Sequence, residues 1–417
     1  MRLLFVTAES HPSFRADIAT LFGRSLIANG VASDLVALAA PGAQRPYTWG
    51  AGQALVRPAE GSMGRLHWQG FFHALRHMLF APAANYNAIQ VRDLPLPAAI
   101  GLLLAGLKGL RFFYWMSYPI PEQQIATARE RGLQAGLARW VFGWLRGRIG
   151  KFLLDHVVLP HADHVFVQSV HMQSALAARG FDASRMTPVP MGVDLDAMAA
   201  CPQEAMADPR LQGREVLVYL GSLDRVRRIE GLFAMVRRLR QHRPAVLLVL
   251  VGDTEDQPHR QWLRGECDRL GLANHVLWTG WLPLHEGWRW VRAARVALSP
   301  VPRGELLDVS SPTKVPEYLA LGVPVVCSDN PDQASIVAGS GAGRCVPYTA
   351  EAFAAAAEEL LALDDAQRQA MIHAGRQWVA QHRDYAVLAQ GLAAKYRQLL
   401  QDIPPSGVTA RRRPTSL

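Results

Sequence analysis

Short apolar runs alternate with amphipathic segments along the first half of the sequence. The runs have the length of buried strands, and the segments between them place apolar residues at helical spacing. Strands that alternate with helices in this way predict a parallel sheet covered on both faces. The predicted strands are Leu3–Thr7, Asp34–Ala39, Ala88–Val91, Arg111–Trp115 and Val165–Gln168, with helices over 17–28, 98–108 and the residues before Gly180.

The second half repeats the same pattern. Its predicted strands are Val216–Leu220, Val246–Val251, 276–278, Val296–Ser299 and Val323–Cys327, with helices over 229–242, 260–270, 285–293 and from about 312. Periodicity is lost between Asp196 and Gly213, which predicts a domain boundary. We therefore expect an α/β fold of two Rossmann-like domains, 1–196 and 214–383, joined by a linker at 197–213 and facing each other across a cleft. Ligands of such sheets bind beyond the carboxyl ends of the strands.

Composition narrows the class of partner. The chain has 417 residues, half of them apolar, which is enough for two domains with buried cores. Its formal net charge of +9 favours nucleotide phosphates, nucleic acid or an anionic membrane surface as partners. Only this charge and a short RRR tail favour nucleic acid, so no nucleic-acid partner is predicted. The basic tail, 403–417, is predicted to be disordered.

Cysteine usage and the length of the apolar runs indicate a compartment. The four cysteines form no CxxC pair, which indicates reduced thiols in a cytosolic protein and no metal centre. The longest apolar stretch, Leu94–Leu107, is shorter than the roughly 20 residues that span a bilayer. The sequence therefore predicts a cytoplasmic protein without a transmembrane helix.

Polar groups follow two predicted strands of the second half. Gly221 and Ser222 come directly after a strand, and the arginines Arg225 and Arg227 follow them. Cations at a helix start are opposed by the helix dipole, so this placement favours an anion between them and the helix over a merely solvated turn. Gly252-Asp253 ends the next strand, and it fits a donor contact and an ordinary turn equally well.

The stretch SSPTKVPEYLALGVPVV carries the strongest signal. Ser311 or the serine before it can cap a helix, and Pro316 must lie in the first turn, which predicts a start near Pro312–Thr313. The free amides of Thr313 and Lys314 then form an anion site, to which Lys314 adds charge. Glu317 lies one turn further on, where a carboxylate can accept hydrogen bonds from a ribose. The alternative is a Lys314–Glu317 pair on a solvated face.

Residues 310–333 resemble the nucleotide-sugar signature of the family 4 retaining glycosyltransferases, which reads S-P-x-K-x-x-E-Y-x-A-x-G-x-P-V-V in one branch. Further segments resemble the same family in order along nearly the whole chain: 162–181, 188–198, 219–232, 248–253, 278–286 and 382–399. The resemblance implies the GT-B fold, in which a C-terminal helix, here 384–402, crosses back to the N-terminal domain.

The resemblance also implies a reaction. A sugar passes from a nucleoside diphosphate sugar to an acceptor with retention at the anomeric carbon, without a metal or other cofactor. By similarity, Glu317 holds the ribose, Lys314 and Arg227 hold the diphosphate, and the loop of Trp281 and Leu282 lies by the base. We expect the acceptor to be a saccharide or a lipid-linked saccharide, as in bacterial surface or extracellular polysaccharide synthesis.

This chain departs from the family pattern in three places. Val309 stands where the family often has a second glutamate, with Asp308 as the nearest acid, and Ser222 replaces an arginine that often follows the glycine. A loop over 9–15 replaces a Gly-Gly turn after the first strand. The departures leave open which groups contact the sugar and the acceptor, and whether Asp308 takes over from the missing glutamate.

Acceptor-binding candidates follow the predicted strands of the first domain. Asp93 ends one strand and is also the candidate catalytic residue there, although it could instead cap the next helix. Ser117 follows another strand, and His11 lies in the first loop, where a lone histidine can simply be structural.

Two segments combine basic and aromatic residues. In 65–80 an apolar stripe runs past Arg65 and Arg76, and 133–154 carries a similar stripe beside several basic residues. Either stripe can face a core, or both can attach the protein to the inner face of an anionic membrane. Two functional alternatives remain: another nucleotide-sugar enzyme of GT-B type, such as an epimerase, and a non-catalytic sugar- or nucleotide-binding protein.

Overall fold

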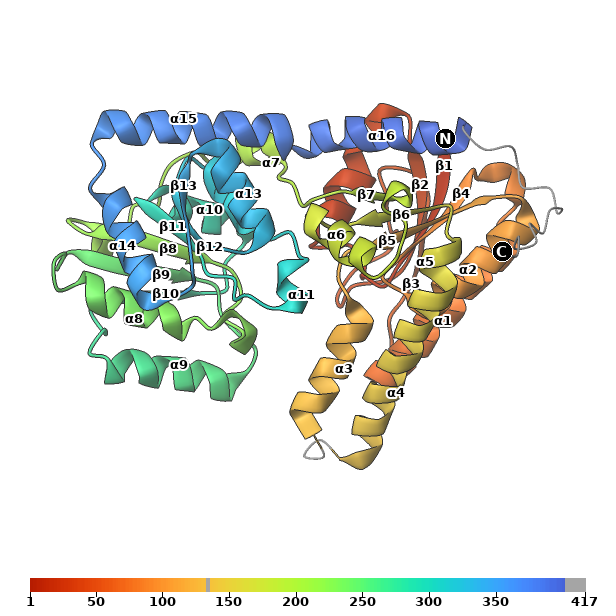
Figure 1. Cartoon of the computed structure of the whole chain (residues 1–417), viewed down its shortest axis with the longest axis horizontal. Coiled ribbons are helices and arrows are strands. Elements are labelled where there is room, and N and C mark those ends of the chain that lie inside the picture. The colour runs from red at the N-terminus through yellow and green to blue at the C-terminus, as the bar shows by residue number, and fades with distance from the viewer. Residues whose placement is uncertain (133–135, 402–417) are drawn as a thin grey trace, which may run out of the picture. The chain divides into compact units, whose positions relative to one another are not determined.

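The computed structural model describes residues 1–132 and 136–401, and these residues form two compact units (Figure 1). The first comprises Met1–Gln168, Gln173–Val189 and the described residues from Ala389, and the second comprises Ser169–Met172 and Pro190–Leu388. The predicted disordered tail and residues 133–135 lie outside the described residues. Each unit is built around one parallel sheet, so the predicted α/β class is confirmed.

The first unit has a seven-stranded parallel sheet in the order β3-β2-β1-β4-β5-β6-β7. Its strands are β1 Arg2–Thr7, β2 Ala32–Leu38, β3 Ala54–Arg57, β4 Ala88–Arg92, β5 Arg111–Met116, β6 His164–Val167 and β7 Met186–Pro188. The main helices are α1 Met63–Phe80, α2 Pro95–Lys108, α3 Ile120–Arg131, α4 Leu137–Leu153, α5 Leu159–His161 and α6 Val170–Ala178, of which α6 begins in the second unit.

The first predicted helix has an unexpected form. Residues Asp17–Ser25 form a π-helix, followed by a short 3₁₀ turn over Ile27–Asn29. Gly30 ends this segment with φ +78°, a left-handed conformation that favours glycine. Its buried face packs under β1, where Phe22 stacks on Phe5 at 4.3 Å.

The second unit has a six-stranded parallel sheet in the order β10-β9-β8-β11-β12-β13. Its strands are β8 Glu215–Leu220, β9 Val246–Val251, β10 Val276–Gly280, β11 Val296–Ser299, β12 Val325–Ser328 and β13 Gly343–Val346. Its helices are α7 Leu195–Ala200, α8 Glu230–Leu239, α9 Gln257–Arg269, α10 Leu284–Arg292, α11 Glu305–Asp308, α12 Lys314–Ala320, α13 Pro331–Ser340, α14 Ala350–Leu361 and α15 Asp365–His382.

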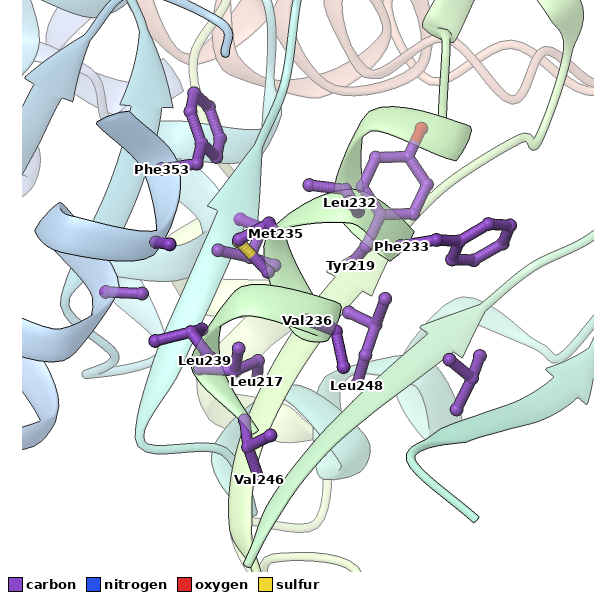
Figure 2. Close-up of a cluster of buried hydrophobic side chains, with 14 of the residues drawn as sticks. Leu217, Tyr219, Leu232, Phe233, Met235, Val236, Leu239, Val246, Leu248 and Phe353 are labelled. Atoms are coloured by element: carbon purple, nitrogen blue, oxygen red, sulfur yellow. The ribbon is translucent and has the colours of Figure 1, made fainter. Parts of the chain in front are cut away.

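One core cluster of the second unit fixes the strands that end at the candidate donor site. Figure 2 shows Leu232, Phe233 and Val236 of α8 packed against the side chains of β8 and β9. All three are fully buried, as is Phe353 of α14 on the same side of the sheet. Burying such side chains contributes about 1.5–3 kcal/mol each. The ends of β8 and β9 therefore sit on a rigid base.

The last helix, α16 Tyr385–Gln401, packs on the first unit. Tyr396 is buried, its ring packs against Phe113 and Phe166, and its hydroxyl donates a hydrogen bond to Gln90 in β4. The predicted closing helix on the N-terminal domain is thus confirmed.

Candidate functional site

The order of strands reverses between β8 and β11 in the second sheet, because β9 and β10 lie on one side of β8 and β12 and β13 on the other. Crevices at such a reversal, beyond the carboxyl ends of the strands, are the usual ligand sites of open α/β sheets. Gly221 follows β8 at this point, and α12 follows β11.

Glycines line this edge of the sheet. Gly221 has φ +145° and Gly252 has φ +134°, both in the region that favours glycine. A Cβ on Gly252 would overlap the carbonyl oxygen of Gly221, and a Cβ on Gly221 would lie 2.9 Å from Nζ of Lys314. Gly221 therefore allows the Lys314 ammonium to lie directly over the backbone at the end of β8.

Lys314 is half-buried at the first position of α12, one residue later than the predicted start at Pro312–Thr313. Its Nζ lies 5.3 Å from the centroid of the Tyr219 ring, a cation–π contact. Burial, together with the nearby charge of Arg227, lowers the pKa of Lys314. Within the described residues, no carboxylate oxygen lies within 4.0 Å of Nζ.

Arg227 is the second cation of the site. It ends the 3₁₀ turn Arg225–Arg227, and its Nε is buried with no hydrogen-bond partner among the described residues. It too forms no ion pair among the residues that the structure describes. Two neighbouring cations without carboxylate partners are costly to bury, and an anionic ligand offsets that cost.

Glu317 completes this group from the next turn of α12. It is half-buried, and burial raises the pKa of its carboxyl, an effect that Lys314 and the Thr313 hydroxyl oppose. No ion pair joins Lys314 and Glu317 in the described part of the chain. The alternative reading of these residues, a paired lysine and glutamate on a solvated face, therefore does not describe this geometry.

Three other predicted donor residues are engaged elsewhere. Arg225 donates to Asp256 at 3.0 Å in an exposed ion pair, and Asp253 accepts from Nε of Arg260 at 2.7 Å. The Ser222 carbonyl accepts from the Tyr219 hydroxyl at 2.8 Å, which shapes the turn after β8. The structure therefore leaves Arg227 rather than Arg225 available to an anion.

The prediction that Ser311 or Ser310 caps α12 is wrong, because the cap position is Thr313. Ser311 has other partners. Its hydroxyl donates to Asp332 at 2.7 Å and accepts from the Met191 amide at 2.9 Å, and Thr313 occupies the cap position without a side-chain capping bond. Arg383, which is also buried, donates to the same Asp332 at 2.7 Å. Ser311 thus belongs to a buried polar network that holds the segment before α12.

The predicted base-binding loop divides into two. Trp281 is 57% exposed just after β10, so its ring is free to stack on a base, whereas Leu282 packs against a further group of buried side chains that includes Leu277 and Trp288. In the same unit Asp308 pairs with Arg303 at 2.8 Å, which lowers its pKa, and Val309 is buried. The charge of Asp308 is therefore already neutralised by Arg303, so Asp308 is not a free carboxylate that could replace the glutamate missing at Val309.

The acceptor candidates of the first unit form a separate cluster at the ends of β4 and β5. Asp93 has φ +56°, and its carboxylate accepts from the Ser117 amide at 2.8 Å and from the Ser117 hydroxyl. It does not cap α2, whose cap position is Leu94. The structure therefore brings Asp93 and Ser117 together.

Arg92 is a member of this cluster that the sequence patterns did not single out. Only 1% of it is exposed, and it pairs with Asp17 at 2.8 Å and with Glu9 and Asp93 at 3.5 Å each. The sequence pattern that could have identified Arg92 is an arginine at the end of an otherwise apolar strand. Its charge ties the loop after β1 to the end of β4.

His11 lies in that loop and is buried. Its Nε2 lies 2.8 Å from the Thr48 carbonyl oxygen, and its ring meets Trp49 edge-on at 5.9 Å. Its Nδ1 is also buried and has no hydrogen-bond partner in the described part of the chain. This placement fits the structural alternative for His11.

Both halves of the chain match known families. Residues 18–192 match the family described as "Glycosyl transferase 4-like domain", and residues 203–378 match "Glycosyl transferases group 1". With the two parallel-sheet units, these matches define the class: the chain is a glycosyltransferase with the GT-B fold. The family models and the relatives below place it with the family 4 type.

Two curated relatives are mycobacterial. The chain is 32% identical over 224 residues to the GDP-mannose-dependent alpha-(1-6)-phosphatidylinositol monomannoside mannosyltransferase of Mycolicibacterium smegmatis, covering 52% of this chain and 57% of that protein. It is 26% identical over 380 residues to the phosphatidyl-myo-inositol mannosyltransferase of Mycobacterium leprae, covering 88% of each. The match to the first relative therefore spans little more than half of its length.

Solved structures share the fold at low identity. Sucrose-phosphate synthase from Thermosynechococcus elongatus superposes with a TM-score of 0.68 at 19% identity, covering 97% of this chain and all of that one. HepE from Anabaena, in complex with UDP, superposes with a TM-score of 0.64 at 16% identity, covering 95% and 100%. Among the described residues, no helix is both long and apolar enough to span a bilayer.

Proposed function

We propose that the protein transfers a sugar from a nucleoside diphosphate sugar to a saccharide or lipid-linked saccharide, with retention and without a metal. One observation carries the proposal: Lys314 and Arg227, without carboxylate partners among the described residues, lie at a glycine-lined sheet edge beside Glu317. A diphosphate supplies the negative charge that this group lacks, and a ribose supplies hydroxyl donors for Glu317.

The leaving group explains why the cations matter. Cleavage of the bond between sugar and diphosphate leaves extra negative charge on the phosphate oxygens. Charge-assisted hydrogen bonds from Lys314 and Arg227 meet this charge, each contributing about 1.5–3 kcal/mol. Cations held in place before the reaction need no reorganisation as the charge develops. Metal independence and retention remain proposals, supported by these fixed cations and by the resemblance of 310–333 to the family 4 signature.

The acceptor side is assigned to Asp93. Its carboxylate lies at the end of β4 and is oriented by Ser117, and the buried Arg92 keeps it close to the loop after β1. We propose that Asp93 hydrogen-bonds the acceptor hydroxyl that attacks the sugar. His11, in the loop after β1, is a weaker candidate for acceptor binding.

The relatives suggest the first substrates to test. Both are named as mannosyltransferases acting on phosphatidylinositol-type acceptors, and one is named as GDP-mannose-dependent. We therefore place GDP-mannose first among donors and a glycolipid first among acceptors, with a role in bacterial surface or extracellular polysaccharide synthesis.

The experiment begins with a thermal-shift screen against GDP-, UDP- and dTDP-sugars, followed by incubation with the labelled donor that stabilises the protein. We expect slow hydrolysis of the donor alone and transfer of the sugar once an acceptor is added. EDTA should not lower either rate. The new glycosidic bond should have the same anomeric configuration as the donor. Binding without release of the nucleotide would favour a non-catalytic binding protein. Isomerisation of the sugar would favour the epimerase-like alternative.

A further inference from the structure

Two cysteines face each other across neighbouring strands of the second unit. Strands β12 and β13 run parallel, and their register places Cys327 directly opposite Cys345. Directly paired residues of neighbouring strands point to the same face of a sheet. Both side chains pack among the buried residues on the face that α12 covers, which include Val315 and Leu319. The two thiol groups therefore lie side by side on one face.

The spacing of the strands suits a disulfide bond. Both cysteines are free thiols in the structure. Neighbouring strands lie about 4.8 Å apart, within the range of about 4.4–6.8 Å that separates the Cα atoms of most disulfides. The Cβ atoms of a disulfide lie about 3.8 Å apart, so the bond must draw the two strands slightly together. A bond that forms under such strain is also readily reduced.

The two thiols are not equivalent. Cys327 is fully buried, whereas Cys345 is half-buried on β13, which lies at an edge of the sheet. A hydrogen bond from Cys327 lowers the pKa of Cys345, and the same bond together with burial raises the pKa of Cys327. The thiolate is the reactive form of cysteine. Cys345 thus suits the role of the thiol that meets an oxidant, and Cys327 suits that of the resolving thiol.

The other two cysteines lack this arrangement. Cys267 lies in α9, where burial raises the pKa of its thiol to about 11. Cys201 is half-buried at the end of α7. Neither of them belongs to a strand, so neither has a partner fixed by strand register. They provide internal controls for the reactivity of the paired thiols.

The cysteine pair lies beneath the helix that carries the candidate donor-binding residues. Helix α12 packs on β12, and Cys327 shares its core with Val315 and Leu319 of that helix. The Tyr318 hydroxyl of α12 accepts from the Leu220 amide at 2.8 Å, which ties the helix to the end of β8. A shift of β12 towards β13 therefore acts on α12. Misplacement of a positioned group by about 1 Å can lower a rate roughly 100-fold.

We propose that Cys327 and Cys345 form a reversible oxidation site that disturbs α12 when the disulfide closes. The oxidant is a peroxide. The Cys345 thiolate attacks one peroxide oxygen, the O–O bond breaks, and the leaving hydroxide takes up a proton to form water. The Cys327 thiol then attacks the sulfur of the resulting sulfenic acid, the S–S bond forms, and the hydroxyl leaves with the thiol proton as a second water.

Two thiols and one hydrogen peroxide thus give one disulfide and two waters, with two electrons passing from the sulfur atoms to the peroxide. A thiol reductant reverses the reaction by exchange. Formation of the disulfide does not depend on the proposed function. Only its effect on turnover rests on that function, because α12 carries Lys314 and Glu317.

The first test maps the bond in the full chain. The folded protein is treated with hydrogen peroxide, its remaining thiols are blocked, and it is digested with trypsin without reduction. Trypsin cleaves after Arg344, so the two cysteines fall in the separate peptides 315–344 and 345–368. These peptides should appear as one linked species, lighter by two hydrogen atoms than their sum, which dithiothreitol separates. Unlinked peptides, or Cys345 linked only to Cys201, would overturn the proposal.

Alanine variants test the role of each thiol. Cys327→Ala removes the resolving thiol, so Cys345 should remain a sulfenic acid that dimedone traps. Cys345→Ala should leave the buried Cys327 unmodified. Cys201→Ala is the matched control and should form the linked peptides as readily as wild type. Modification of Cys327 in Cys345→Ala as fast as that of Cys345 in Cys327→Ala would overturn the assigned roles.

The last arm measures sugar transfer before and after oxidation. Turnover of the fully linked wild-type protein should fall by about 10- to 100-fold and recover with dithiothreitol, because the bond displaces the packing beneath α12. Cys345→Ala should keep its turnover in peroxide. Full turnover of the linked protein would overturn the coupling to α12. A reduced protein that forms the linked peptides on oxidation but transfers no sugar would contradict the proposed function alone.

Discussion

Replacement of Lys314 by methionine tests the donor assignment most directly. Methionine keeps the unbranched stem of the side chain over Gly221 and removes only the ammonium. Lys314 has no carboxylate within 4.0 Å in the described chain, so its charge is available to the leaving diphosphate. Loss of one such preorganised donor costs about 2.7–4 kcal/mol in the barrier. Turnover should therefore fall by about 100- to 1,000-fold.

The same substitution should stabilise the protein in the absence of donor. Burial and Arg227 lower the pKa of Lys314 from its ordinary 10.5, so the unfolded chain binds more protons than the folded chain below that value. The charged form therefore costs stability at neutral pH, and methionine removes the cost. A gain of about 1–2 kcal/mol, as expected for a half-buried charge that solvent partly screens, corresponds to about 2–8 °C in Tm.

The assay combines turnover, thermal stability and pH. Wild-type affinity for the nucleoside diphosphate should weaken as pH rises from the lowered pKa of Lys314 towards 10.5, because the diphosphate binds the ammonium. Lys314→Met should lose this dependence and most of its stabilisation by nucleotide. Lys395→Met, at a lysine that donates to Gln398 on α16, is the matched control and should behave as wild type. Near-normal turnover of Lys314→Met with unchanged Tm would refute the phosphate assignment.

Two other changes probe the same site. Glu317→Ala should raise the donor KM about 10- to 150-fold with a smaller effect on kcat, since a carboxylate–hydroxyl hydrogen bond contributes about 1.5–3 kcal/mol. It should also abolish the preference for ribonucleotides over 2′,3′-dideoxynucleotides, which is measured by competition. An unchanged sugar preference would remove Glu317 from the ribose site. Gly221→Ala, whose new Cβ would lie 2.9 Å from Lys314 Nζ, should weaken nucleotide binding in calorimetry, whereas Gly213→Ala, also at positive φ (+69°) but in open space, should not. Equal affinity in the two alanine variants would show that Lys314 need not lie over Gly221.

The sequence was sufficient to predict most of the strands that support the site. Strands buried on both faces appear as continuous apolar runs, so Val246–Val251 and Val296–Ser299 could be predicted to the residue. Strand β3 could not, because its residues are half-buried or exposed at a sheet edge and resemble a loop. The arrangement of donor-site residues followed from local spacing, since Lys314 and Glu317 lie on one short helix.

What could not be predicted depends on partners far away in the sequence. Ser311 pairs with Asp332 and Met191, and Asp253 pairs with Arg260, so neither side chain keeps the role that its position beside a strand or helix suggested. Local patterns report which residues stand near a strand end, but not which of them are already neutralised. Arg92 shows the reverse: it belongs to a buried strand, yet its partners make it part of the acceptor cluster.

The missing ion pairs therefore define the donor site more sharply than the motif does. Of the two arginines predicted to bind phosphate, Arg225 is neutralised by Asp256, whereas Arg227 keeps a buried Nε that has no partner within residues 1–132 and 136–401. Burial and the nearby Arg227 lower the pKa of Lys314, so the charged lysine is costly to hold in the free protein. A diphosphate, whose two phosphates can each meet one cation, would offset this cost, which supports the proposed donor site.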